Sequence, residues 1–584
     1  MRTAECSTDH RLIRMKYRLP DIAQQRYHRD SHSRPRRFAV HRFNRLPFMS
    51  EEEAEGVSAL RAGYCAGLES RLADTYDSAS SVDCKWSAVK SAVVDVAGEV
   101  VGRDKRRVPD WFRDSAPTLE PLLATRNRLY DLWLRTGHQN DHRAFKEARG
   151  QARAGIRRAK TTWLMEKAAV VQRGRFSGKY VWSAIRDMQR CFGGLKPISV
   201  QAIRDTRGDV CGSVQEQRDT WHGHFSGVLN VCSTYDAEVF QQIPQREIMH
   251  SLTQPPSGEE LTHALRHLKN GKAGGMSQIV PELLKAGVPV LHPLLLDLLQ
   301  SVWSEGYVPQ DWRNAVLIPI PKKGDLSRCD NWRGIALLEV VGKLVARVVQ
   351  NRLQVLAEDE LPESQCGFRR NRGCADAIFS VRQLVEKSYE HRSKLFCVFV
   401  DLPKAYDSVP REALWQALLR LGVPPQAVTL VKSFHTDMLA SVRVAGGCTD
   451  PISVQNGLRQ GCVMAPVLFN LYFGLVMERW RSVLRERGIE SGVDFSFLIN
   501  GQLFPRAAGR RRQSQTGHAD DFEFADDAVL LATTRAAADL SLSAFCDVAS
   551  SFGLTVSMTK TKLLVAGYGV AAADCSDLAS VGPH

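Results

Sequence analysis

Apolar runs separated by charged turns divide the second half of the chain into short elements. Residues 395–400, LFCVFV, form an unbroken apolar run, which predicts a central strand buried on both faces. Residues 523–533, EFADDAVLLAT, have apolar residues on both sides of two acids, which predicts a strand, a tight turn and a second strand. Residues 314–325, NAVLIPIPKKGD, predict a buried strand that ends in two lysines and a turn.

Helical spacing dominates elsewhere. Residues 332–353 predict an extended entry followed by a helix, and a helix is expected from Pro466 onward. Residues 366–387, CGFRRNRGCADAIFSVRQLVEK, are interpreted as a second basic strand and turn. In the first half, Asp110 can cap a helix, residues 119–171 predict one long helix or a helical pair, and residues 259–268 predict an amphipathic helix.

These patterns predict five segments. Residues 1–48 are basic and lack apolar periodicity, which is typical of a flexible segment, and residues 49–255 are mainly helical. Residues 256–301 form further helices, residues 302–567 carry the alternating strands and helices, and residues 568–584 are a short tail. A chain of 584 residues is expected to contain several domains.

Composition narrows the partners. The formal net charge is +14 and the pI is about 9.2, which favours a polyanion, with nucleic acid ahead of an anionic membrane surface. There is no run of 18 apolar residues and no secretory N-terminus, so the sequence predicts a soluble protein of the nucleus or cytoplasm without a membrane partner. The 14 cysteines contain no Cys-x-x-Cys pair, which argues against a zinc ribbon.

Three acids suggest a metal site. Asp526 and Asp527 are adjacent, and such like charges repel unless a cation neutralises them. Carboxylate oxygens favour Mg²⁺, although an ordinary surface turn is the simpler explanation of an isolated pair. Asp401 ends the predicted central strand, where an unpaired carboxylate is costly to bury, and is therefore the candidate third ligand. Asp407 is interpreted as a helix cap or turn residue.

Basic and glycine-containing loops lie around these acids. Cations follow several apolar elements, where they could hold a triphosphate or a template backbone or could simply be solvated: Lys322, Lys323, Arg333, Arg369, Arg370 and Arg372. The loop at Gln460 and Gly461 enters a helix and can approach a base pair closely. The glycine-rich loop at 270–275 is weak evidence for phosphate binding. The basic side chains of residues 146–160 could contact phosphates or form a solvated helix face.

Six blocks occur in a fixed order between residues 302 and 567: VLIPIPKKGD with NWRGIALL, QCGFRRNRGCADAIFSVRQL, FVDLPKAYDSVPR, NGLRQGCVMAPVLFN, FADDAVLLAT and FGLTVSMTKTKLL. This set resembles the reverse transcriptases of non-LTR (LINE-type) retrotransposons. The resemblance implies an α+β right-hand polymerase with fingers and palm behind a mainly helical N-terminal region. The function it implies is RNA-directed DNA synthesis on an RNA template, from a DNA primer and deoxynucleoside triphosphates.

The resemblance also implies roles for individual residues. Asp401, Asp526 and Asp527 match the catalytic ligands of two Mg²⁺ ions, with Mn²⁺ as an alternative. Tyr406 matches the aromatic gate that excludes a ribose 2′-hydroxyl. Lys323 and Arg333 match the residues that bind the triphosphate. Gln460 and Gly461 match the loop next to the incoming nucleotide, and Lys560 matches the proton donor to pyrophosphate.

The ends of the chain suggest truncation. Residues 7–10 resemble the terminal motif of an apurinic-type endonuclease, and only 22 residues follow Lys562, so the thumb is expected to be largely absent. One alternative is therefore an inactive remnant that only binds RNA. An RNA-dependent RNA polymerase is another, although Tyr406 and the Phe-Ala-Asp-Asp form argue against it. Asp520 and Asp521 resemble an imperfect copy of the acidic motif, and the chemistry is assigned to Asp526 and Asp527.

Overall fold

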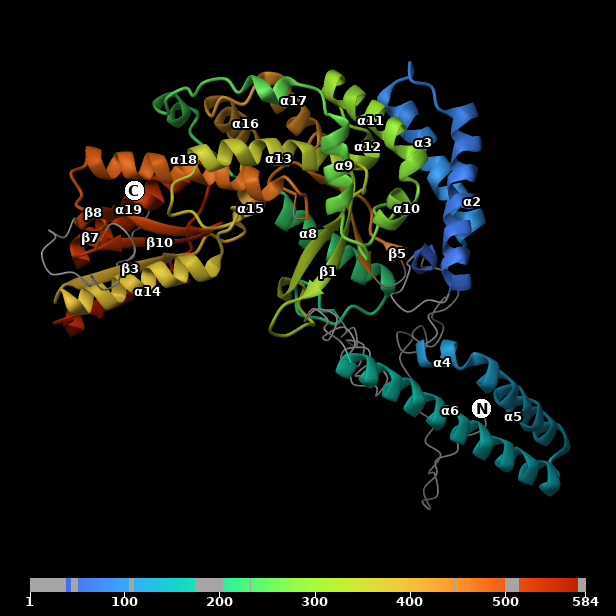
Figure 1. The fold of residues 1–584 in the computed structure, drawn as a ribbon. Helices are drawn as coiled ribbons and strands as arrows, with labels where there is room; N and C mark the ends of the chain where they lie inside the picture. Colours follow the sequence, from blue (N-terminus) through green and yellow to red (C-terminus); the bar gives the residue numbers. More distant parts are fainter. Residues whose placement is uncertain are drawn as a thin grey trace, which may run out of the picture. The chain divides into compact units, whose positions relative to one another are not determined.

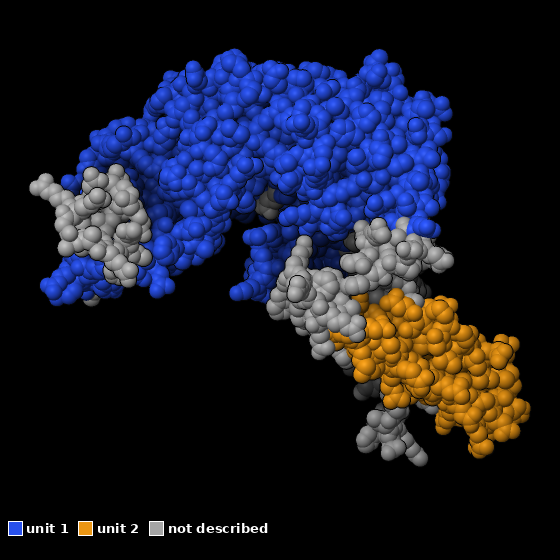
Figure 2. Space-filling model, viewed as in Figure 1, with its two compact units in different colours: residues 1–35, 40–101, 203–584 blue, residues 36–39, 102–202 orange. Residues whose placement is uncertain are grey.

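The computed structural model describes residues 38–43, 51–103, 110–173, 203–231, 233–444, 447–459, 461–498 and 514–575. It divides the chain into two compact units, which Figure 2 distinguishes by colour and which are described separately. Unit 1 contains residues 1–35, 40–101 and 203–584, and unit 2 contains residues 36–39 and 102–202. The endonuclease-like residues 7–10 and the loop residue Gln460 lie outside the described residues.

Unit 2 is built around a pair of long helices. They are α5 (Ala116–Thr136) and α6 (Gln139–Arg173), preceded by the short α4 (Asp110–Asp114). Gly137 ends α5 with a φ of 66°, a left-handed conformation that favours glycine. The stretch predicted as one long helix or a helical pair at 119–171 is therefore divided into two helices at this turn. One side of α6 is buried, and its aromatic and small residues include Phe145, Ala148 and Trp163.

Within its described residues, unit 1 combines helices with three β-sheets. Its helices are α2 (Glu51–Thr75), α3 (Val82–Val96), α8 (Val214–Leu229), α9 (Gly258–His267), α10 (Pro281–Ala286), α11 (Val288–Glu305), α12 (Gln310–Arg313), α13 (Gly342–Glu360), α14 (Cys374–Glu390), α15 (Ala405–Ser408), α16 (Arg411–Arg420), α17 (Pro425–Ser433), α18 (Ala465–Glu486) and α19 (Arg535–Ser551). Its shorter helical segments are η1 (Val40–Phe43), η2 (Ala97–Val101), η3 (Ala237–Gln242), η4 (His250–Thr253), η5 (Cys329–Asn331) and η6 (Ala572–Cys575).

The first sheet has five strands. They are β1 (Ala315–Pro321), β2 (Trp332–Leu337), β4 (Met438–Val444), β5 (Gly447–Cys448) and β6 (Ile452–Val454). The order is β2-β1-β4-β5, with β6 also paired to β4, and only the β1 and β4 pair is parallel. Helix α8 packs on this sheet, and a Cβ on Gly334 of β2 would lie 2.6 Å from the Phe225 ring. The glycine therefore lets the helix approach the strand.

The second sheet carries the predicted acids. Its order is β11-β3-β10-β9, with β3 (Lys394–Val400), β9 (Asp521–Phe524), β10 (Asp527–Ala532) and β11 (Lys562–Gly567), and every pair is antiparallel. Leu395 and Cys397 of β3 pack with Leu384 of α14 on one face. Helices α18 and α19 lie on the other side, so the central strands are enclosed between helical layers (Figure 1). The chain is accordingly α+β in character.

Two features complete unit 1. A two-stranded sheet pairs β7 (Val493–Leu498) with β8 (Ser514–Ala519). The α2 and α3 pair is attached to the region before the first sheet by Lys85, which lies 2.8 Å from Asp297, and by Lys90, which lies 2.7 Å from Asp311. Within the described residues, no helix is long and apolar enough to cross a membrane.

One predicted element is wrong. Residues 374–387, interpreted as part of a basic strand and turn, form the first four-fifths of helix α14. The Gly373 N–H donates to the Asp376 carboxylate at 2.7 Å, so Asp376 binds back to the start of the helix and satisfies a donor there. Leu384 and Ser388 are buried at helical spacing on the face that packs against the second sheet.

Candidate active site

The β9–β10 hairpin places the two adjacent acids at one end of the second sheet. Phe524 pairs with Asp527, so Ala525 and Asp526 form a two-residue turn and Asp527 is the first residue of β10. This arrangement matches the predicted strand, turn and strand. Ala525 is buried and has a φ of 59°, a left-handed conformation that is uncommon for residues with a side chain.

Asp401 follows the neighbouring strand at the same end. The β10–β3 ladder ends at the Ala528 and Val400 pair, so the next residues of the two strands are Asp527 and Asp401. The Ser557 N–H donates to the Asp401 carbonyl oxygen at 2.9 Å, which fixes this position against the loop before β11. That loop also carries Lys560, whose Nζ lies 3.5 Å from Asp401 Oδ2. Antiparallel pairing thus gathers residues from three distant segments.

The electrostatics of the three acids are linked. Burial, followed by the charges of Asp527 and Asp401, raises the pKa of the Asp526 carboxyl, while Arg333 of β2 acts in the opposite direction. Burial and the charge of Asp401 likewise raise the pKa of Asp527. The charge of Asp401 therefore disfavours ionisation of both Asp526 and Asp527, as expected of carboxylates that share one site.

The acids suit a divalent cation but do not form a complete set of ligands. In the described part of the chain, no three His, Cys, Asp or Glu side chains are grouped closely enough to hold a metal ion by themselves. Asp401 Oδ2 is nevertheless buried and accepts no hydrogen bond from a described residue. Mg²⁺ takes few protein carboxylates and completes its shell with water and substrate phosphates. An incomplete carboxylate site with an unsatisfied oxygen fits that preference.

Tyr406 lies beside the acids. It belongs to α15, five residues after Asp401, and its ring stacks on Phe469 with 4.4 Å between centroids and 22° between planes. Burial and the charge of Asp526 raise the pKa of the Tyr406 phenol, and its hydroxyl is buried without a hydrogen bond to a described residue. The ring is thus fixed from behind, next to the acidic turn.

The loop before α18 approaches β2. Gly461 has a φ of 96°, and a Cβ there would lie 2.8 Å from the Ala336 carbonyl oxygen, so both its conformation and its surroundings favour glycine. Arg459 fixes the same loop by donating to the carbonyl oxygens of Phe434 and Trp312 at 2.8 and 2.9 Å. The loop therefore meets the strand that carries Arg333.

The predicted cations have different surroundings. Arg333 and Lys560 are exposed and interact with the acids, as described above. Lys323 is exposed in the loop between β1 and β2, and among the described residues it forms no salt bridge. The structure therefore brings Asp401, Tyr406, Asp526, Asp527, Arg333 and Lys560 together, and it brings Gly461 to the strand of Arg333.

Two arginines expected at a triphosphate or template support the fold instead. Arg369 is buried, donates to the Pro362 carbonyl oxygen at 2.6 Å and lies 3.0 Å from the Glu358 carboxylate. Arg372 forms an ion pair with Glu363. A guanidinium that is already occupied by carboxylate and carbonyl groups has few donors left for a phosphate.

Two other motifs are also structural. The Arg481 guanidinium lies 2.7 Å from Asp521 Oδ1, so the imperfect copy of the acidic motif forms a buried ion pair. In the glycine-rich loop the Gly271 N–H donates to Glu282. Just after the loop, the Ser277 N–H donates to Glu339 at 2.8 Å. Because carboxylates occupy these amides, they are not available to a phosphate.

Comparison with known proteins identifies the region that contains this site. Residues 320–574 match the family model described as reverse transcriptase (RNA-dependent DNA polymerase). This region is therefore similar to reverse transcriptase domains. The resemblance to non-LTR retrotransposon enzymes predicted from the six sequence blocks is confirmed.

Relatives extend the match beyond the domain. The chain is 24% identical over 359 residues to the probable RNA-directed DNA polymerase from transposon BS of Drosophila melanogaster, which covers 60% of this chain and 39% of that protein. It is 25% identical over 284 residues to the RNA-directed DNA polymerase from mobile element jockey of the same organism, covering 47% of this chain and 31% of the relative. The chain thus spans less than two-fifths of the length of these relatives.

Proposed function

We propose that this chain is an RNA-directed DNA polymerase of a non-LTR retroelement that extends a DNA primer with deoxynucleotides on an RNA template, in the nucleus or cytoplasm. The observation that carries the proposal is the meeting of Asp401, Asp526 and Asp527 at one end of an antiparallel sheet inside a region similar to reverse transcriptase domains. In this proposal the second sheet is the palm and the first sheet, with β1 and β2, belongs to the fingers.

The acids have the first role. Asp401, Asp526 and Asp527 would hold two Mg²⁺ ions, or Mn²⁺ ions in their place. When bound, these ions would activate the primer 3′-hydroxyl and stabilise the charge on the pyrophosphate leaving group. The raised pKa values of Asp526 and Asp527 support this role, because a bound cation would offset the burial and the carboxylate repulsion that raise them.

The surrounding residues would bind and select the nucleotide. Arg333 and Lys323 are proposed to contact the triphosphate, and the exposed position of both leaves their donors available. Gln460 and Gly461 are proposed to border the incoming nucleotide, where the absent side chain of Gly461 permits close approach. Tyr406 would occupy the space of a ribose 2′-hydroxyl. Lys560, beside Asp401, would donate a proton to pyrophosphate.

Primer extension tests the assignment of the acids. An RNA template with an annealed DNA primer is incubated with Mg²⁺ and deoxynucleoside triphosphates. We expect Asp526→Asn to reduce extension by about 100-fold or more, because it weakens the binding of the metal ions that would stabilise the transition state. The matched control is Asp450→Asn, an exposed aspartate outside the site, which should extend like the unchanged protein. Equal extension by the Asp526→Asn variant and the control would reject the site.

Helix α6 favours a second candidate function, RNA binding without synthesis. Lys146, Arg149, Arg153, Arg157 and Lys160 recur every three or four positions, so they share one face. Of these, Lys146, Arg153 and Arg157 are exposed. Such a face can bind phosphates in a chain that has no polymerase activity. Salt-dependent RNA binding without extension at saturating primer would favour this remnant over the enzyme.

A further inference from the structure

The turn that carries Asp526 has an unfavourable backbone. Ala525 has a φ of 59°, a conformation that L residues rarely adopt. The turn also lies next to β9, the edge strand of its sheet. A turn of this kind keeps its shape only if the surrounding structure holds it.

Gln365 binds both sides of this turn. Its side chain is fully buried, and its Oε1 accepts from the Ala525 N–H at 3.0 Å and from the Gly367 N–H at 2.7 Å. Its Nε2 donates to Glu523 Oε2 at 2.9 Å and approaches the Ala525 carbonyl oxygen at 3.5 Å. One amide group therefore contacts the N–H and the C=O of the left-handed residue and the strand before it.

The backbone around Gln365 is paired with β9. The Cys366 N–H donates to the Glu523 carbonyl oxygen at 2.9 Å, and the Glu523 N–H donates to the Ser364 carbonyl oxygen at 3.0 Å. A Cβ on Gly367 would lie 2.2 Å from the Ala525 nitrogen, so only glycine fits where the two segments cross. Residues 364–366 thus act as an additional parallel strand that covers the sheet edge.

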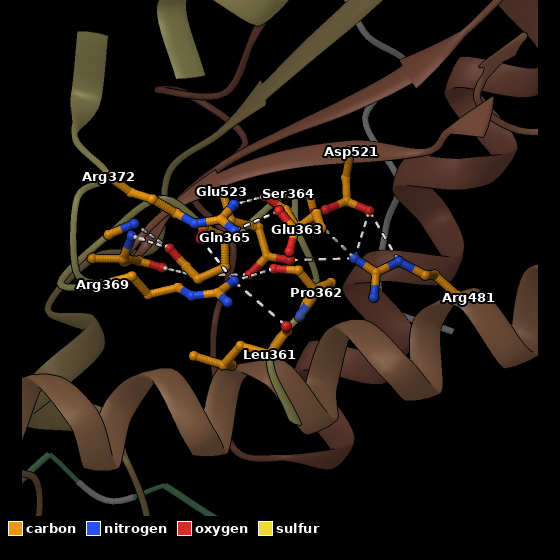
Figure 3. A network of polar contacts seen from close by, with 12 residues as sticks. Leu361, Pro362, Glu363, Ser364, Gln365, Arg369, Arg372, Arg481, Asp521 and Glu523 are labelled. Atoms are coloured by element: carbon orange, nitrogen blue, oxygen red, sulfur yellow. Dashed lines mark hydrogen bonds and ion pairs between the residues drawn. The ribbon is translucent and has the colours of Figure 1, made fainter. Parts of the chain in front are cut away.

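Charged groups hold this added strand on two sides (Figure 3). The Arg481 guanidinium of α18 lies 2.7 Å from Asp521 and 3.3 Å from Glu523, and it donates to Ser364 Oγ at 3.3 Å. On the other side Arg369 donates to carbonyl oxygens of the segment before Gln365. The position of Gln365 is therefore set by side chains that do not reach the acids of the site.

We infer that Gln365 is a positioning residue that holds the turn of Ala525 and Asp526 in the shape that presents the catalytic carboxylates. It acts through the Ala525 backbone and not through contact with substrate. The catalytic part of this inference rests on the proposed polymerase function, whereas the structural part, a turn held by a buried amide, does not. The hydrogen bonds to Ala525 and the covered sheet edge carry the inference.

Amide hydrogen exchange tests directly whether Gln365 holds the turn. In the unchanged protein we expect the Ala525 amide to exchange slowly at residue resolution, although it lies in a tight turn, because it donates to a buried acceptor. Gln365→Met keeps the size of the side chain and removes its polar atoms, and it should accelerate exchange at Ala525. The control is Gln416→Met, a half-buried glutamine bonded to the Tyr235 hydroxyl at 3.2 Å, which should leave Ala525 unchanged.

Primer extension well below the unfolding temperature supplies the second readout. Gln365→Met should lower kcat by about 10-fold to 100-fold, the expected effect of a misplaced catalytic group, and raise the Mg²⁺ concentration for half-maximal extension. A merely structural role would lower the melting temperature and leave both quantities unchanged. Fast exchange at Ala525 in the unchanged protein would overturn the inference even if Gln365→Met does not fold.

The two proposals fail in different ways. If the unchanged protein extends no primer, the polymerase function fails, and the exchange of Ala525 still shows whether Gln365 holds the turn. If extension is normal in Gln365→Met and exchange at Ala525 is unaltered, the positioning role is rejected while the polymerase function stands.

Discussion

At the scale of single residues, the stacking of Tyr406 on Phe469 gives a physical basis to the proposed role of Tyr406 as an aromatic gate. The 4.4 Å stack limits the movement of the ring, so the ring can exclude a group by its bulk. We predict that Tyr406→Val increases the incorporation of ribonucleotides relative to deoxynucleotides by about 10-fold or more, since roughly 1.4 kcal/mol of lost discrimination gives that factor.

Competition between the two nucleotide types in primer extension measures this change. The control is Tyr568→Val, an exposed tyrosine after β11, which should preserve the ratio. If the unchanged protein already prefers ribonucleotides, the chain is an RNA-dependent RNA polymerase instead, and Tyr406 is not a gate.

Glu523 gives the fold a dependence on pH. It is fully buried, and burial together with the charge of Asp521 raises its pKa well above the ordinary value, an effect that Arg481 and Gln365 only partly oppose. The folded state therefore holds a proton that the unfolded state releases, so the free energy of unfolding falls as pH rises above the ordinary carboxyl range.

Glu523→Gln should remove that dependence. Between about pH 5 and pH 8, the free energy of unfolding should fall less in this variant than in the unchanged protein. The two slopes should differ by up to about 1.4 kcal/mol for each pH unit. Denaturant titration at several pH values measures the difference, and Glu490→Gln, an exposed glutamate, is the control. Parallel pH curves for the unchanged protein and Glu523→Gln would contradict a protonated, buried Glu523.

At the scale of elements, the pattern of apolar and polar residues predicted strands best where an apolar run fitted only a strand. Residues 395–400 form all but the first residue of β3, and the acidic hairpin forms β9 and β10. Helix α14 was mistaken for a strand because its exposed Ile378 and Phe379 interrupt a clean polar face. Periodicity is weak evidence for a segment whose apolar residues are not all buried.

The site was only partly predictable for a related reason. Asp401, Asp526 and Asp527 end apolar runs, a signal that a sequence shows directly. Arg369 and Arg372 looked like ligands because their partners, Glu358 and Glu363, are separated from them by 9 to 11 residues and by a turn. Gln365 opens one of the six sequence blocks, but the block itself gives no indication of its role, which depends on pairing with Glu523, 158 positions away. Long-range pairings of this kind are set by tertiary structure.

The basic face of α6 presents the exposed side chains of Lys146, Arg153 and Arg157 to solvent. We predict that changing Lys146, Arg153 and Arg157 together to Gln weakens RNA binding and reduces the slope of log affinity against log salt by about 2, at roughly 0.7 for each phosphate contact on a single strand. The control changes Arg126, Arg128 and Arg135 of α5 to Gln, which removes the same charge from the other helix. Equal slopes for both triple variants would show that only net charge matters.

At the scale of the whole molecule, two kinds of charge serve different purposes. The net charge of +14 comes from basic residues in many segments, above all residues 1–48, whereas the negative charge of the acidic site is concentrated at one end of one sheet. Diffuse positive charge attracts a polyanion at long range and is screened by salt, while a carboxylate cluster acts over a few ångströms and requires a divalent cation. RNA binding and synthesis should therefore respond to different conditions.

Removal of divalent cations should separate the two. With excess chelator, we predict that primer extension is lost and that RNA affinity changes by less than about 2-fold, because the phosphate contacts come from lysine and arginine. Added Mn²⁺ should restore extension, since carboxylate and phosphate oxygens also suit that ion. Raising salt from about 50 mM to about 200 mM should lower RNA affinity by about 100-fold for five contacts to a single strand. Filter binding and primer extension on the same RNA provide both measurements. If RNA binding is lost when the metal is removed, the acidic site holds the template and the diffuse positive charge does not.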